Sequence, residues 1–164
     1  MEKKWNINSF LCESADEKVT NIKNIFDTLR IKKDGTASFT IVTMLNAFEC
    51  DESSFRLYYF MERLDEDQMA YLGNSYFERD STKSLSSSRP KSSGCVESAV
   101  SMMIRVDVKG VNFPSTGQYE LQVYKYDNTD AENIDDKSPE EQGKWAERQH
   151  LVATYPFNVY ISEE

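Results

Sequence analysis

Apolar and polar residues alternate along several stretches of the chain with the two-residue period of a β-strand. The clearest stretch is residues 99–108, in which every second residue is apolar and lies on one parity of the strand: Val100, Met102, Ile104, Val106 and Val108. Its other parity is mostly polar, which predicts a strand with one buried face and one wet face. Residues 119–123 and 155–161 alternate in the same way, and each is preceded or interrupted by turn residues. Pro156 lies on the polar parity, which indicates an edge or a strand start because proline cannot donate a ladder hydrogen bond.

Two further stretches, residues 38–48 and 55–64, are apolar on both parities and rich in β-branched and aromatic residues. This composition predicts central strands that are covered on both faces. Residues 5–13 and 70–77 are interpreted as additional strands. Short strands at this spacing predict an all-β fold, an antiparallel two-sheet β-sandwich of the Ig-like or C2-like kind, with a barrel as the less favoured alternative.

One segment gives conflicting signals. Its apolar residues Val19, Ile22, Phe26 and Leu29 fall at helical spacing. The intervening asparagines and β-branched residues are poor helix formers. Periodicity alone predicts a helix here.

Two insertions interrupt the strand pattern. Residues 81–94 are Ser-rich and locally basic, which predicts a flexible loop; ordering on a partner or phosphorylation is the functional alternative. Residues 127–148 are mostly acidic, and Ser138, Pro139 and Glu141 are suited to begin a short helix that continues to about residue 147. We interpret residues 1–164 as a single β-sandwich domain that carries this one short inserted helix.

Composition narrows the classes of function. The chain has 164 residues, a hydrophobic content of 39% and a net charge of −9, with 28 acidic residues against 19 basic ones. This acidity opposes direct binding to nucleic acid, because phosphate binding requires clustered Lys and Arg. The first residues, MEKKWNINSF, lack the apolar region of a secretory signal, and no apolar run is long enough to span a membrane. We therefore expect a cytoplasmic protein that does not bind membranes.

Two blocks of sequence are similar to a known family: FLCESADEKVTNIKNIFDTLRI near the start, and FPSTGQYELQVYKYD with YPFNVYI near the end. The chain resembles a family of small bacterial proteins known only as a domain of unknown function. The matching positions are Phe113, Gly117, Tyr119, Phe157 and Val159. The resemblance implies an antiparallel β-sandwich and a strand over residues 22–31, and it implies no activity. The two insertions depart from the family's pattern.

Residues that could support catalysis or metal binding are few. Phosphate-binding glycine loops, zinc-protease motifs and nucleophile elbows do not occur in the sequence. His150 is the sole histidine, and its position near a helix end favours a structural role. Cys12, Cys50 and Cys95 are too widely spaced for a metal knuckle. We expect no cofactor and no metal, with Ca²⁺ binding by the carboxylates of residues 127–136 as the alternative.

A partner-binding surface is the favoured functional site. Its candidate residues are Tyr58, Phe60, Tyr124, Tyr126 and Trp145. Several of them lie on the parity opposite the expected core, and Tyr and Trp are effective interface anchors. In the competing interpretation, Tyr58 and Phe60 lie under a second layer and Trp145 fastens the inserted helix to the sandwich.

These observations favour a non-enzymatic, protein-binding module of bacterial or phage origin. The partner is unidentified, and a homo-oligomer stays open. One alternative is an acidic nucleic-acid mimic that inhibits a DNA-binding enzyme, which requires carboxylates in rows at about the phosphate spacing of a duplex. A second alternative is a small-ligand binder or hydrolase, which requires a pocket around His150 or a cysteine.

Overall fold

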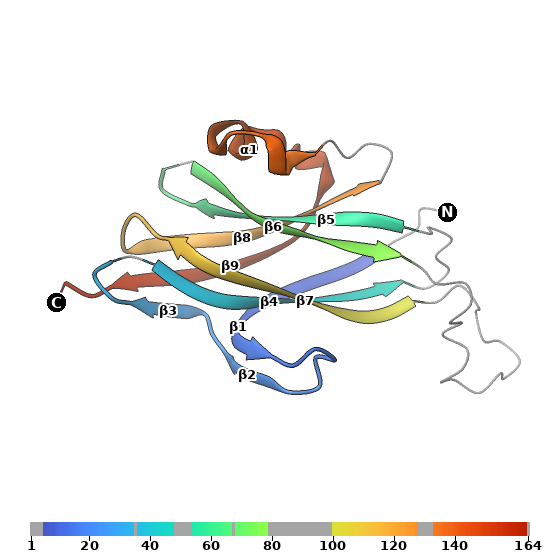
Figure 1. Ribbon diagram of the computed structural model, residues 1–164, viewed down its shortest axis with the longest axis horizontal. Helices are drawn as coiled ribbons and strands as arrows, with labels where there is room; N and C mark the ends of the chain where they lie inside the picture. The colour runs from blue at the N-terminus through green and yellow to red at the C-terminus, as the bar shows by residue number, and fades with distance from the viewer. Residues whose placement is uncertain are drawn as a thin grey trace, which may run out of the picture.

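The chain forms two β-sheets that pack face to face, with one short helix outside them (Figure 1). The computed structural model describes residues 5–34, 36–47, 54–66, 68–78, 100–127 and 133–163. The strands are β1 (Trp5–Ala15), β2 (Ile22–Ile25), β3 (Thr28–Ile31), β4 (Thr36–Ala47), β5 (Ser54–Arg63), β6 (Gln68–Glu78), β7 (Val100–Asn112), β8 (Gly117–Asp127) and β9 (Leu151–Ile161). The four-stranded sheet has the order β2-β1-β4-β7, and the five-stranded sheet has the order β3-β9-β8-β5-β6. The predicted two-sheet β-sandwich with one short inserted helix is confirmed.

Among the described residues, all strand pairs are antiparallel except β3 with β9, which run parallel. The alternation in β8 and β9 places Tyr119, Leu121, Phe157 and Val159 in the core, as predicted. Pro156 lies just before the part of β9 that pairs with β3, so this position has a strand neighbour on one side only. The missing N–H of proline is tolerated at such a position.

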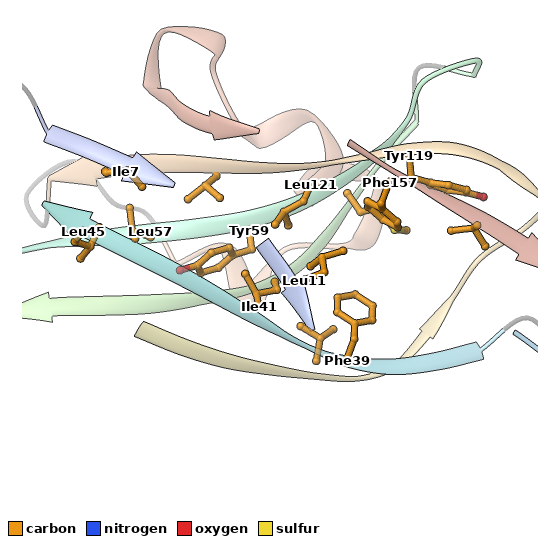
Figure 2. Close-up of a cluster of buried hydrophobic side chains, with 14 of the residues drawn as sticks. Ile7, Leu11, Phe39, Ile41, Leu45, Leu57, Tyr59, Tyr119, Leu121 and Phe157 are labelled. Atoms are coloured by element: carbon orange, nitrogen blue, oxygen red, sulfur yellow. The ribbon is translucent and has the colours of Figure 1, made fainter. Parts of the chain in front are cut away.

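The core lies between the two sheets (Figure 2). Leu11 from β1 and Ile41 from β4 face Leu57 and Tyr59 from β5, and all four side chains have no exposed surface. Burying side chains of this kind stabilises the fold by about 1.5–3 kcal/mol each relative to leaving them exposed.

A chain of hydroxyl groups crosses this apolar layer. The Thr43 hydroxyl is 2.7 Å from that of Ser9 and 3.0 Å from that of Tyr59, which in turn lies 3.0 Å from the Ser75 hydroxyl. The chain joins strands of both sheets, because Ser9 and Thr43 belong to β1 and β4 while the other two belong to β5 and β6. Burial raises the pKa of Tyr59. Hydrogen bonding satisfies polar groups that would otherwise be costly to bury.

The two strands that are apolar on both parities, β4 and β5, are internal in their sheets, as predicted. On the outer face of β4, Val42 packs with Cys12 and with Val19 from the segment after β1. Val19 has a φ of 52°, an unusual conformation for a β-branched residue. On the outer face of β5, Tyr58 and Phe60 pack against Trp145 at the end of the inserted helix.

The buried face predicted for residues 99–108 is only partly formed in β7, because Met102 is exposed and Val108 is buried. β7 is an edge strand of the four-stranded sheet. Met102 on the inward parity is 40% exposed, and Met103 on the outward parity is 44% exposed. Edge position leaves the beginning of β7 open on both faces, whereas Val108 near its other end is buried.

The helix expected from periodicity over residues 19–29 is not formed. The segment contains β2 and β3, which belong to different sheets, so the strand implied by the family resemblance is present but interrupted at Phe26 and Asp27. Val19 and Ile22 pack outside the four-stranded sheet, while Phe26 joins the main core. The helical spacing therefore arises from a chain that crosses between layers.

The inserted helix α1 (Pro139–Trp145) begins where the sequence predicts. Ser138 is the N-cap, and its Oγ accepts a hydrogen bond from the Glu141 N–H at 3.3 Å. The predicted pair of Lys144 with Glu140 forms at 3.4 Å. The helix ends at Trp145, two residues before the predicted end, because Ala146 adopts an extended conformation. In the described part of the chain, no helix is long and apolar enough to cross a membrane.

Candidate functional site

The five predicted interface residues lie together on the outer face of the five-stranded sheet. We call Tyr58, Phe60, Tyr124, Tyr126 and Trp145 the aromatic cluster. Tyr58 and Tyr124 are directly paired between β5 and β8. The ring of Trp145 lies 4.6 Å from the ring of Tyr58 and 4.6 Å from that of Tyr126.

The insertion covers this cluster. Figure 1 shows α1 over the five-stranded sheet, on the side away from the four-stranded sheet. Ile134, in the 3₁₀ helix η2 (Ile134–Asp136), is buried in the same cluster. The Tyr126 hydroxyl accepts a hydrogen bond of 2.9 Å from the Glu147 N–H, which fixes the chain after the helix.

The cluster is therefore a second hydrophobic core. Tyr58, Phe60, Tyr124 and Tyr126 are all buried, and burial raises the pKa of the three tyrosines. The exposed patch that the partner-binding interpretation requires is not formed by these residues, because the insertion lies over them. Their arrangement matches the competing interpretation, in which Trp145 fastens the helix to the sandwich.

The other residues singled out in the sequence have structural contacts. The His150 Nδ1 lies 3.0 Å from the Lys125 carbonyl oxygen, and its ring stacks on Tyr126 at 4.0 Å. The Cys12 Sγ donates to the Ser14 carbonyl, and burial raises the pKa of this thiol. Cys50, Cys95 and the Ser-rich loop at 81–94 lie outside the described residues.

Most of the acidic stretch proposed for Ca²⁺ also lies outside the described residues. Of the part that is described, Asp135 accepts a hydrogen bond from the Tyr71 hydroxyl, and Asp136 accepts one from Asn133. Across the described ranges, no group of three or more His, Cys, Asp or Glu side chains is placed to hold a metal ion.

An open groove of about 510 Å³ lies at another part of the five-stranded sheet. We call it the β3–β9 groove; it is lined by Thr28, Arg30, Thr116, Gly117, Gln118, Asn158, Val159 and Tyr160. Strand register brings these residues together. Thr28, Asn158 and Gln118 form one row across β3, β9 and β8, and Arg30 is paired with Tyr160 in the next row.

Several groove side chains are not engaged with the rest of the described chain. The guanidinium of Arg30 lies over the Tyr160 ring, 5.6 Å from its centroid, and Tyr160 is 52% exposed. Within the described ranges, no hydrogen bond or ion pair engages this guanidinium or the side-chain amides of Gln118 and Asn158. Thr116 is different, since its Oγ1 accepts a hydrogen bond from the Ile161 N–H. The groove therefore gathers available polar groups beside an exposed aromatic ring.

Sequence analysis did not find this groove. Asn158, Tyr160 and Gln118 alternate with core residues, so their outward direction could have been deduced from parity. The family resemblance implied a strand over residues 22–31, but no sequence pattern placed Thr28 and Arg30 beside β9, which their strand joins in parallel.

No protein-family model matches the chain, and no curated protein matches it. Solved structures that are similar include the CARDB domain of a Pyrococcus furiosus protein in complex with di-metal ions. That domain is 6% identical in sequence, the TM-score is 0.46, and the match covers 98% of this chain and 96% of the other. The resemblance to the uncharacterised bacterial family stays a prediction.

Proposed function

We propose that this chain is a non-catalytic domain that binds a protein partner, and that the partner docks in the β3–β9 groove. The observation that supports the proposal is the convergence of Arg30, Gln118 and Asn158 on one groove, where their side chains have no intramolecular hydrogen bond or ion pair within the described chain. Arg and Tyr are enriched among the residues that dominate binding energies at interfaces. Tyr160 places an exposed ring next to Arg30, so the groove presents one residue of each type.

The chemistry of the groove distinguishes this proposal from the two alternatives. The groove lining includes a cation and no carboxylate, whereas an acidic mimic of nucleic acid would bind through rows of carboxylates. The alternative of a ligand site around His150 or a cysteine concerns other parts of the chain, since neither residue type lines the groove.

The proposal includes a bacterial or phage origin and a cytoplasmic location. Cys12 is a free, buried thiol, which is compatible with a reducing compartment. In this proposal the aromatic cluster has a supporting role, because it holds the insertion against the same sheet that carries the groove.

Affinity capture followed by mapping of the contact surface tests the proposal. The tagged chain would be used to capture proteins from its host, and hydrogen exchange would be measured with and without the captured protein. We expect slower exchange in residues 28–31, 116–118 and 158–161. Protection confined to α1 or to β7 would contradict the proposal.

A matched pair of double variants provides the control. Arg30→Glu with Tyr160→Ala is expected to abolish capture. Arg56→Glu with Tyr76→Ala alters a similar pair at another part of the same sheet, where Arg56 lies over the Tyr76 ring at 5.0 Å, and it should leave capture unchanged. If both double variants capture the partner as well as the wild type does, the partner binds elsewhere.

A further inference from the structure

The lining of the β3–β9 groove is rich in hydrogen-bond donors. Arg30 contributes a guanidinium, and Gln118 and Asn158 each contribute an amide NH₂ group. None of the eight lining residues is Asp or Glu. A groove with this lining is complementary to an acceptor that carries negative charge.

The environment of Arg30 leaves its donors accessible. A guanidinium that lies over an aromatic ring keeps its N–H edge available for a planar acceptor with two oxygens. Arg56, which has a similar contact with a tyrosine, is different because its guanidinium also donates to the Asn74 side chain at 3.0 Å.

The surroundings of β3 are locally basic although the whole protein is acidic. Lys32 and Lys33 are exposed and follow β3 directly, so three cationic residues occur within four positions of the sequence. Two carboxylates flank this segment: Asp27 accepts a hydrogen bond from the Thr28 hydroxyl, and Asp34 accepts one from the Thr36 N–H. Counting these two carboxylates against the three cations, residues 27–34 carry a net charge of +1 on a protein of net charge −9, so the segment beside the groove is weakly basic.

We infer that the β3–β9 groove recognises a single carboxylate, the side chain of an Asp or Glu in an acidic segment of the partner. Arg30 binds both carboxylate oxygens, and the amides of Gln118 and Asn158 donate to the same group or to the adjoining backbone. This inference rests on the proposed function and names the chemical class of the bound segment.

Charge and size favour a carboxylate over a phosphate. One cation lines the groove, which matches a monoanion, whereas a phosphate monoester carries about −1.5 to −2 charges and is commonly bound by a cluster of arginines. The groove volume of about 510 Å³ lies within the range of roughly 300–1,000 Å³ typical of ligand sites. It can accommodate one side chain together with its flanking backbone.

Titrations with short capped peptides, followed by amide NMR shifts of the full chain, test the inference. The probes are Ac-Ala-Glu-Ala-NH₂, its Gln counterpart and its phosphoserine counterpart. We expect saturable shifts in residues 28–31, 117–118 and 158–161 with the Glu peptide, and binding at least about tenfold weaker with the Gln peptide, because a hydrogen bond to a charged group is lost.

Two variants link the result to the groove. Arg30→Gln should weaken binding of the Glu peptide by about tenfold or more, and Arg30→Lys should recover only part of it because lysine lacks the planar fork. Arg56→Gln should bind like the wild type. The NMR spectrum itself shows whether each variant is folded.

The other outcomes overturn the inference. Equal binding of the Glu and Gln peptides would remove the role of charge, and tighter binding of the phosphoserine peptide would assign the groove to phosphate. If no peptide binds but hydrogen exchange still places a captured protein on the groove, the inference fails while the proposed function stands. If the captured protein contacts another surface, the proposed function fails as well.

Discussion

Gly143 is a position where a substitution that normally stabilises a helix should have the opposite effect. It lies inside α1, and replacing a glycine with alanine in an exposed helix gains about 1 kcal/mol. A Cβ atom at Gly143, however, would lie 2.7 Å from the backbone carbonyl oxygen of Met69. Real Cβ atoms essentially never approach an oxygen so closely, so either α1 or the strand must move.

The strand cannot move cheaply, because Met69 belongs to β6 and is paired with Glu62 of β5. Overpacking of this kind costs about 1–3 kcal/mol, which exceeds the gain in helix propensity. We expect Gly143→Ala to lower the free energy of unfolding by about 1–2 kcal/mol, or to lift α1 away from the sheet and expose Trp145.

Urea denaturation and tryptophan emission measure the two effects. Trp5 is the other tryptophan, so a Trp5→Phe background leaves Trp145 as the sole reporter. Gly117→Ala is the matched control, since its Cβ would meet only the Arg63 side chain at 3.9 Å and should be neutral or slightly stabilising. A Gly143→Ala protein as stable as the wild type, with unchanged Trp145 emission, would refute the packing argument.

Three further predictions concern the cores. Thr43→Val removes the hydroxyl that bonds to both Ser9 and Tyr59, and it should lower the free energy of unfolding measured by chemical denaturation by about 1–3 kcal/mol. An unchanged free energy of unfolding would show that the hydroxyl chain is dispensable. Burial raises the pKa of Tyr71 to about 12, so the contribution of its neutral hydroxyl to stability is complete below pH ~10 and is lost as the pH rises through 12. The free energy of unfolding in urea, measured from pH 9 to 12, should therefore decline less for Tyr71→Phe than for the wild type. Parallel declines of the two proteins would contradict this. Trp145→Ala should accelerate amide exchange in α1 while β4 keeps its protection, and a uniform acceleration would mean that the aromatic cluster is not a separate unit.

Much of the fold could be predicted from residue patterns. Alternation in residues 119–123 and 155–161 depends on strand geometry alone, so it indicated both the strands and their buried faces. The start of α1 was equally predictable, because the hydrogen bond from the Glu141 N–H to Ser138 is local. Such features involve residues close together in sequence, and their geometry follows from the backbone.

The path of residues 19–31 depended on tertiary structure. Their apolar spacing is compatible with a helix, and the decision came from Phe26 packing into the main core while Val19 packs outside the four-stranded sheet. The burial of the aromatic cluster was also undetermined, since parity shows that Tyr58 and Tyr126 point outward from the core but not what covers them. Both outcomes depend on contacts between residues distant in sequence.

The sequence by itself determined most of the strands, where the inserted helix begins and which side chains of each of those strands share a face. Only the tertiary structure decided that β3 lies parallel to β9 and that Arg30 meets Tyr160, Gln118 and Asn158 in one groove. The reason is physical: side-chain alternation is a property of one strand, whereas the register between strands 130 positions apart is set by the packing of the whole domain, as in the pair Thr28 and Asn158.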